Sequence, residues 1–170
     1  MMLELYIIRH GLAGRSLEDE AMDHERPLKK KGKEKMKDIA KGLQKLKIEF
    51  DVVVTSPLLR SKESAEIVNA HCCDTKEVAV TDLLCPGASY NNLIKFLNKL
   101  KDSKKVAIVG HEPFLSGFAS YCLTNNKDSL MSLKKGGILK LEMDGVIKPG
   151  KCMLSWLMEP RQLIQAKSNK

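Results

Sequence analysis

The chain has 170 residues, 43% of them hydrophobic and 29% charged, a composition typical of one globular domain that needs no disulfide or metal to fold. Its net charge of +8 would attract anionic partners; because the lysines are not interleaved with aromatic residues, we do not expect nucleic acid among them. With five cysteines, no Cys-x-x-Cys pair and no apolar run near the roughly 20 residues that cross a bilayer, we expect a cytoplasmic protein with reduced thiols, no membrane contact and no metal.

Short apolar runs alternate with amphipathic stretches along the chain. The mostly apolar run Leu3–Ile8 and the run Val106–Val109 predict strands, the β-branched run Val52–Val54 is typical of a strand buried on both faces, and Val78–Val80 is a weaker candidate. Apolar residues at helical spacing lie between and after these runs, in segments 36–46, 61–71, 93–100 and 115–122. This alternation predicts an α/β three-layer sandwich with a mostly parallel central sheet.

The pattern changes near the carboxyl terminus. Leu139, Leu141 and Met143 alternate with charged residues, and after two turn signals the segment Cys152–Met158 is apolar again. Such a pair predicts an antiparallel addition with an antiparallel edge strand at one side of the sheet. We therefore expect a single domain over residues 1–160 and a polar, frayed tail over residues 161–170.

Chemically distinctive residues follow three of the predicted strands. Arg9, His10 and Gly11 follow the first strand, segment 56–60 with the sequence Ser-Pro-Leu-Leu-Arg follows the second, and segment 110–113 with Gly-His-Glu-Pro follows Val109. In parallel α/β sheets, ligands bind beyond the carboxyl ends of the strands. Two histidines and two arginines are therefore expected to share one pocket.

These residue types suit phosphoryl chemistry. Arginine forks bind phosphate oxygens, and nearby positive charge keeps an imidazole such as His10 neutral and able to attack phosphorus. A second histidine, His111, can donate a hydrogen bond to the phosphoryl oxygens, and Gly11 lets the backbone pass close to an anion. Each residue alone has an ordinary structural explanation, so the prediction depends on their joint placement.

The same residues resemble a known family. Segments 5–11 (LYIIRHG), 55–60 (TSPLLR) and 109–113 (VGHEP), together with Arg26-Pro27-Leu28, Gly32 and Pro86-Gly87, occur in the order found in the histidine phosphatase (phosphoglycerate mutase-like) superfamily. Within it the chain is similar to the short phosphohistidine phosphatases of the SixA type. The resemblance implies a phosphoglycerate mutase-like fold and no cofactor or metal. It implies that His10 is the phosphorylated nucleophile, and that the rest of the phosphate pocket consists of Arg9, Arg60 and His111.

The short length, without an inserted lid, predicts an open site that suits a phosphoryl group carried by another protein. A histidine leaving group, with a reference pKa of about 6.5, also needs less help from an acid than an alkoxide does. We therefore expect hydrolysis of phosphohistidine on a protein partner, such as a histidine phosphotransfer domain. A phosphomonoesterase for a small phosphorylated metabolite is the alternative, and a non-catalytic phosphate-binding module is a third.

Two carboxylates keep the alternative open. Glu112, next to His111, is either a proton donor or a residue that complements a helix dipole. Asp82, after the weak third strand, is either an acid or a cap.

The run Lys29–Lys31 is either a solvated turn or a docking site for an acidic partner.

Overall fold

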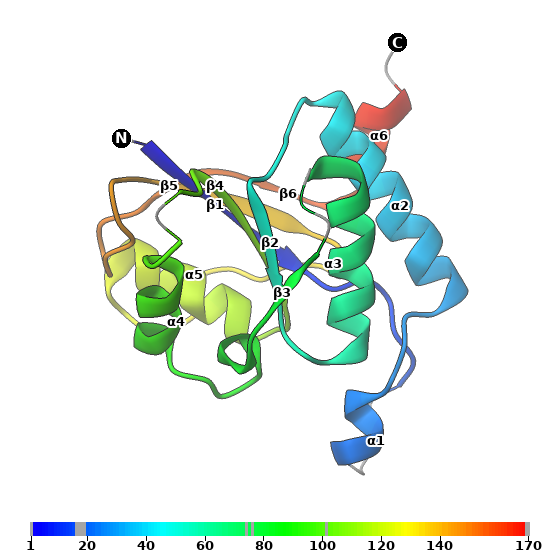
Figure 1. Cartoon of the computed structure of the whole chain (residues 1–170), viewed down its shortest axis with the longest axis horizontal. Helices are drawn as coiled ribbons and strands as arrows, with labels where there is room; N and C mark the ends of the chain where they lie inside the picture. Colours follow the sequence, from blue (N-terminus) through cyan, green and yellow to red (C-terminus); the bar gives the residue numbers. More distant parts are fainter. Residues whose placement is uncertain (1, 16–19, 74, 76, 101, 169–170) are drawn as a thin grey trace.

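The predicted alternation of strands and helices is present in the computed structural model, which describes residues 2–15, 20–73, 75, 77–100 and 102–168 (Figure 1). The strands are β1 (Met2–Arg9), β2 (Val52–Thr55), β3 (Ala79–Val80), β4 (Lys105–Gly110), β5 (Ile138–Asp144) and β6 (Met153–Met158). The helices are α1 (Glu20–His24), α2 (Lys30–Lys45), α3 (Leu59–Cys72), α4 (Tyr90–Leu97), α5 (Phe114–Thr124) and α6 (Pro160–Ser168), with a short 3-10 helix, η1 (Asp82–Leu84). No helix of the described residues is long and apolar enough to span a bilayer.

All six strands form one sheet in the order β3-β2-β4-β1-β5-β6. Strands β3, β2, β4 and β1 run parallel to one another. Strand β5 pairs antiparallel with β1, and β6 pairs antiparallel with β5 at the sheet edge. This confirms the predicted α/β class with a mostly parallel sheet and an antiparallel addition at one edge.

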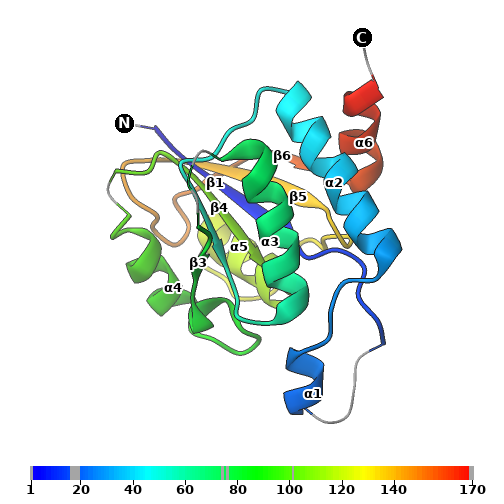
Figure 2. The same cartoon turned by 45° about the vertical axis from the view of Figure 1, so that its right-hand side comes forward.

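Helices cover both faces of the sheet, because the central strands bury their residues in alternation on two sides. In β1, Leu5 and Ile7 belong to a core that includes residues of α4 and α5. Tyr6 and Ile8 belong to a second core that includes residues of α2, α3 and α6. Figures 1 and 2 show these two groups of helices on opposite sides of the sheet. The three-layer arrangement explains why the buried residues of β1, β2 and β4 are mostly apolar on both faces of the sheet.

The parallel strands place their following residues at one edge of the sheet. Arg9 lies opposite Gly110 in the β1–β4 pair, and Thr55 lies opposite Val109 in the β2–β4 pair. The chain therefore leaves these three adjacent strands at the same level. This register brings the segments after residues 9, 55 and 110 together, although they are far apart in the sequence.

The structure differs from the sequence prediction at residues 161–168, which were expected to form a frayed polar tail. They belong to α6, which packs beside α2 (Figure 2). Leu163 is fully buried, and Gly42 of α2 lies so close to its carbonyl group that a Cβ at position 42 would collide with it. An ion pair of 2.6 Å between Lys167 and Asp38 adds a second contact. Residues 169–170 lie outside the described part of the chain.

Candidate active site

His10 lies directly after β1 and is only 6% exposed. Its Nδ1 is 2.7 Å from the carbonyl oxygen of Gly11. Because a carbonyl oxygen only accepts hydrogen bonds, Nδ1 carries the proton and Nε2 keeps its lone pair. Burial, reinforced by the charges of Arg60 and Arg9, lowers the pKa of His10 to about 4. The ring is therefore neutral at pH 7 and presents an unprotonated Nε2.

His111, directly after β4, lies beside His10, with 5.1 Å between the ring centroids. Its Nε2 is 2.6 Å from the hydroxyl oxygen of Ser56, which follows β2. Burial, together with His10 and Arg60, lowers the pKa of His111 to about 3. Three adjacent strands thus supply three side chains to one place. Ser56 was part of a predicted segment, but the sequence did not indicate that it orients His111.

Arg60, in the first turn of α3, is held by α1. Its Nη1 donates to the backbone carbonyl oxygen of Asp23 at 2.8 Å, and its Nη2 is 3.2 Å from the Asp23 carboxylate. The same carboxylate accepts a bond of 2.9 Å from Nε of Arg26. Asp23 therefore bridges two arginines. Sequence reasoning missed Asp23, because nothing in its acidic neighbourhood distinguishes it from the adjacent carboxylates.

Arg9, the last residue of β1, is held by a different segment. Its Nη1 donates to the carbonyl oxygen of Leu133 at 2.7 Å. The N–H of Leu133 donates in turn to Oε2 of Glu112 at 3.3 Å, and the N–H of Ser116 in α5 donates to Oε1 of Glu112 at 2.9 Å. Both carboxylate oxygens of Glu112 thus accept backbone hydrogen bonds. One of these bonds leads through Leu133 to Arg9.

Gly11 is fixed by the segments on either side of it. Its N–H donates to the hydroxyl of Ser64 at 3.0 Å, and that hydroxyl donates to the carbonyl oxygen of Arg60 at 2.7 Å. A Cβ at position 11 would lie 2.7 Å from Cγ of Met36 in α2. The glycine therefore permits a close approach between the segment after His10 and α2.

Three buried nitrogen atoms at this edge of the sheet have no hydrogen-bond partner within the described part of the chain. They are Nε of Arg9, Nε of Arg60 and Nδ1 of His111. A buried polar group without a partner costs about 1–3 kcal/mol. The described residues contain no other buried side-chain nitrogen or oxygen in this state. The oxygens of an anion would supply the missing acceptors for the arginine nitrogens, and for Nδ1 when it carries the proton of His111.

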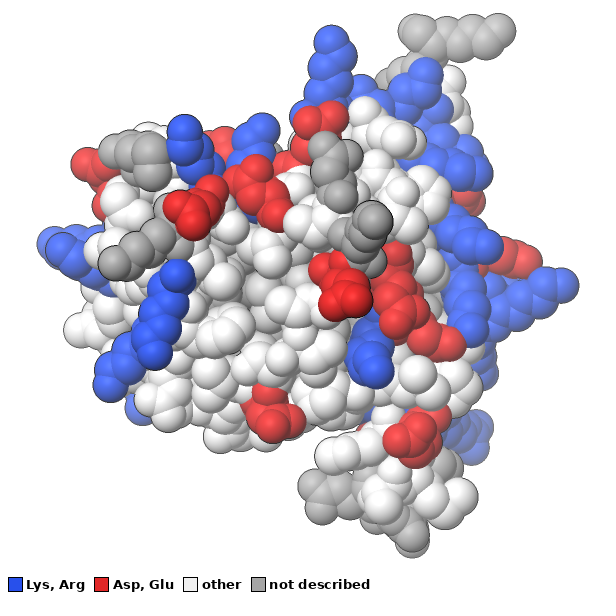
Figure 3. All heavy atoms as spheres, viewed as in Figure 1, with Lys and Arg blue, Asp and Glu red and all other residues white. Residues whose placement is uncertain are grey.

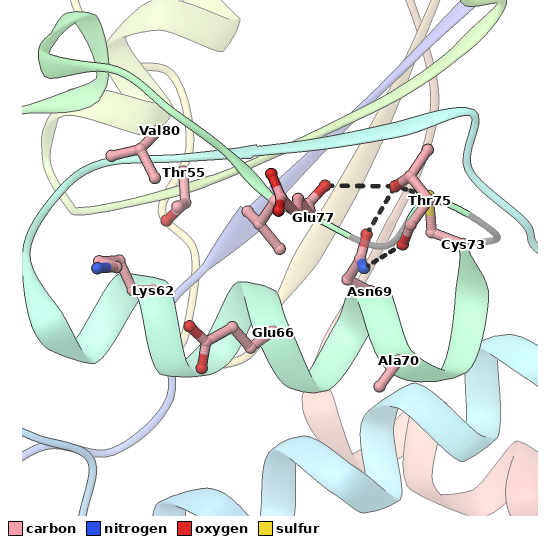
Figure 4. Close-up of a pocket in the computed structure, with 10 residues that line it drawn as sticks. Thr55, Lys62, Glu66, Asn69, Ala70, Cys73, Thr75, Glu77 and Val80 are labelled. Carbon is pink, nitrogen blue, oxygen red and sulfur yellow. Dashed lines mark hydrogen bonds between the residues drawn. The ribbon is translucent and has the colours of Figure 1, made fainter.

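Asp82, the other predicted carboxylate, belongs to a segment that reaches the same edge of the sheet, because the N–H of Thr81 donates to the carbonyl oxygen of Thr55 at 2.9 Å. Asp82 is exposed at the start of η1. A hollow of about 590 Å³ lies between α3 and β3 and is lined by Thr55, Lys62, Asn69 and Thr75 among others (Figure 4). It includes the carboxylates of Glu66 and Glu77, and it contains none of the predicted phosphate-binding residues. Among the described residues, no three His, Cys, Asp or Glu side chains gather as metal ligands would.

Known proteins resemble this chain in sequence. The family model for the histidine phosphatase superfamily (branch 1) matches residues 5–84. An uncharacterized protein from Picosynechococcus sp. (strain ATCC 27264 / PCC 7002 / PR-6) is 35% identical over 141 residues, which cover 82% of this chain and 84% of the relative.

Solved structures of similar fold cover almost the whole chain. The protein histidine phosphatase SixA complexed with tungstate has a TM-score of 0.81 at 23% identity, covering 95% of this chain and 99% of its own. Phosphoglycerate mutase from Bacillus anthracis str. Sterne has a TM-score of 0.66 at 14% identity, covering 98% of this chain and 97% of its own. These likenesses confirm the predicted phosphoglycerate mutase-like fold.

Proposed function

The chain belongs to the histidine phosphatase superfamily and is a phosphatase, and from that premise we propose that it works through a phosphorylated His10 and removes phosphoryl groups from histidine on a protein partner. The observation that carries the proposal is the set of three buried nitrogen atoms without partners at the sheet edge where His10 and His111 lie with 5.1 Å between their ring centroids. They belong to Arg9, Arg60 and His111. A bound phosphoryl group would supply oxygen atoms as acceptors to these nitrogens while its phosphorus faces Nε2.

The reaction has two steps. Nε2 of His10 attacks phosphorus in line, and an N–P bond forms as the P–N bond of the substrate breaks. The departing imidazole takes up a proton from solvent. A water molecule then attacks the phosphorus of phosphorylated His10, the bond to Nε2 breaks, and the proton of the water is released as inorganic phosphate leaves. Arg9, Arg60 and His111 stabilise the phosphoryl oxygens in both steps.

The surroundings of Glu112 favour a phosphohistidine substrate over an alkyl phosphate. An alkoxide leaving group needs a proton from a general acid. Both oxygens of Glu112 already accept backbone hydrogen bonds, from Ser116 and Leu133, so the whole carboxylate is engaged in holding the backbone. A histidine leaving group, with a reference pKa of about 6.5, needs less help than an alkoxide and can take its proton from solvent.

The proposal is tested by trapping the intermediate. A phosphohistidine peptide labelled in its phosphoryl group is mixed with wild-type protein, with the variant His10→Ala and with the control His71→Ala, which alters a histidine at the far end of α3. We expect acid-labile label and turnover for the wild type and the control, and neither for His10→Ala. Thermal unfolding checks that His10→Ala is folded. Near-normal turnover by folded His10→Ala would overturn the proposal.

A further inference from the structure

The positive charge of this protein is concentrated in one segment. Residues 29–47 contain nine lysines and only two acidic residues, Glu34 and Asp38, a surplus of seven out of the net charge of +8. The rest of the chain is therefore almost neutral. Figure 3 shows the result as a band of lysine and arginine side chains along the side of the molecule where Figure 1 places α2.

The helix α2 separates its lysines from its apolar residues. Met36, Ile39 and Leu43 face the core, and the lysines that are exposed lie on the opposite side or flank the helix. We call this set the basic face: Lys29, Lys30, Lys31, Lys35, Lys37, Lys41, Lys45 and Lys47. One of the two acidic residues of the segment, Asp38, is already ion-paired with Lys167 of α6, so little negative charge opposes the basic face.

The basic face begins beside the proposed active site. The N–H of Lys29 donates to the carbonyl oxygen of Leu12 at 2.9 Å, and the backbone of Gly32 packs against the same carbonyl group. Leu12 is two residues after His10. From this contact the 16-residue helix extends about 24 Å, so the lysines lead away from the site over a distance much longer than a metabolite.

The loop that holds Arg9 lies against the same helix. The N–H of Gly136 donates to the carbonyl oxygen of Arg9 at 3.0 Å. A Cβ at position 136 would lie 2.6 Å from Cδ1 of Ile39 in α2. The exposed Lys135 precedes this glycine, as does Lys134, which is ion-paired with Glu159 at 2.9 Å. Positive charge therefore borders the site on the side of α2.

We propose that the basic face docks an acidic surface of the phosphorylated protein partner and so directs its phosphohistidine to His10. The inference rests on the proposed function. Only a macromolecule can contact the far end of α2 while its phosphoryl group reaches the site. An acidic protein fits better than single-stranded nucleic acid, because the segment 29–47 contains no aromatic residue on which a base could stack.

The test compares two triple variants with the same change of charge. The first, Lys37→Glu/Lys41→Glu/Lys45→Glu, alters the basic face. The control, Lys95→Glu/Lys99→Glu/Lys127→Glu, alters exposed lysines on α4 and in loops. Glutamate is a good helix former, so both variants should fold, and thermal unfolding checks this. The substrates are an acidic histidine phosphotransfer protein phosphorylated on histidine, and free phosphohistidine.

With the protein substrate, we expect kcat/KM of the first variant to fall about 10- to 100-fold, as loss of electrostatic steering allows, and that of the control to fall less than about threefold. With free phosphohistidine, both variants should match the wild type. Equal losses in both variants, or none in the first, would overturn the docking proposal. The proposal would also be overturned if the first variant lost binding to a single-stranded RNA probe but kept its activity on the protein substrate. If the wild type hydrolyses neither substrate, the proposed function itself fails.

Discussion

Replacing Glu112 by Gln tests whether this residue positions Arg9 or donates a proton. Glutamine keeps the shape of the side chain but has only one oxygen, so one of the two backbone N–H groups would face an NH₂ group. The bond from Ser116 is 2.9 Å and the bond from Leu133 is 3.3 Å, so we expect the longer bond to be lost. Hydrogen bonds to charged groups contribute about 1.5–3 kcal/mol, and the long distance favours the lower end.

A loss of about 1.5 kcal/mol corresponds to roughly a tenfold change in rate. The Leu133 carbonyl oxygen accepts the hydrogen bond of Arg9 at 2.7 Å, so loosening this peptide should weaken phosphoryl binding whatever the leaving group. We therefore expect kcat/KM of Glu112→Gln to fall about tenfold on a phosphohistidine peptide, and by the same factor on an alkyl phosphate.

The assay measures kcat/KM for both substrates with the wild type, Glu112→Gln, Arg9→Ala and the double variant. If Glu112 acts through Arg9, the substitution Glu112→Gln should lower kcat/KM only slightly in a protein that already carries Arg9→Ala. The effects of substitutions within one hydrogen-bond network are not additive. A proton donor would behave differently. The reasoning is refuted by a loss of a hundredfold or more confined to the alkyl phosphate, or by effects of the two substitutions that simply multiply.

Four further outcomes are expected. Asp23→Ala should lower kcat/KM about tenfold on any substrate, measured by steady-state kinetics, because Arg60 loses a charge-assisted bond worth about 1.5 kcal/mol; an unchanged value would contradict this. The NMR titration of His10 should show no midpoint between pH 5 and 8, because its pKa is lowered to about 4. For the same reason the contribution of His10 to the free energy of unfolding, fully present above about pH 6.5, should fall by about 1.4 kcal/mol per pH unit towards pH 4, in addition to a similar fall from His111, and a slope unaltered in His10→Ala would contradict it. Gly42→Ala should destabilise the protein by about 1–3 kcal/mol in denaturant unfolding, since its Cβ collides with the backbone of Leu163; wild-type stability would show that α6 does not dock as described.

The sheet could be predicted from the sequence because its signal is local and repeated. Segments such as Leu3–Ile8 and Val106–Val109 are short and mostly apolar, and both lie within central strands. Helix α6 was missed for the opposite reason. Its docking includes a buried leucine, Leu163, and a glycine of α2, Gly42, that leaves room for it. Neither residue indicates a contact when it is considered alone.

The residues that hold the candidate site in place were less predictable than the site residues. His10 and His111 were found because they follow strands, and parallel strands bring such residues together. Asp23 and Leu133 were not found, because their contacts with the arginines span 37 and 124 residues of sequence. Leu133 contributes only a backbone carbonyl oxygen, which any residue could supply, so its identity carries no signal.

The two arginines are held in chemically different ways, and this difference bears on the histidines. Arg60 and Arg26 share the carboxylate of Asp23, whereas Arg9 donates to a neutral carbonyl oxygen. The site without substrate therefore keeps an excess of positive charge. Together with burial this excess holds His10 and His111 neutral.

A bound phosphoryl dianion would reverse that balance. Its two negative charges favour protonation of a nearby imidazole, so the pKa of His111 should rise when the site is occupied. His10 should stay unprotonated at Nε2 as long as that atom faces phosphorus, because its lone pair then points at the reacting atom. Its Nδ1 proton is already hydrogen-bonded to the carbonyl oxygen of Gly11. The same charges thus keep His10 nucleophilic before binding and let His111 become a stronger hydrogen-bond donor afterwards. We therefore expect inorganic phosphate to move the NMR titration of His111 upward from its low starting pKa, and an unmoved titration in phosphate-saturated protein would contradict this coupling.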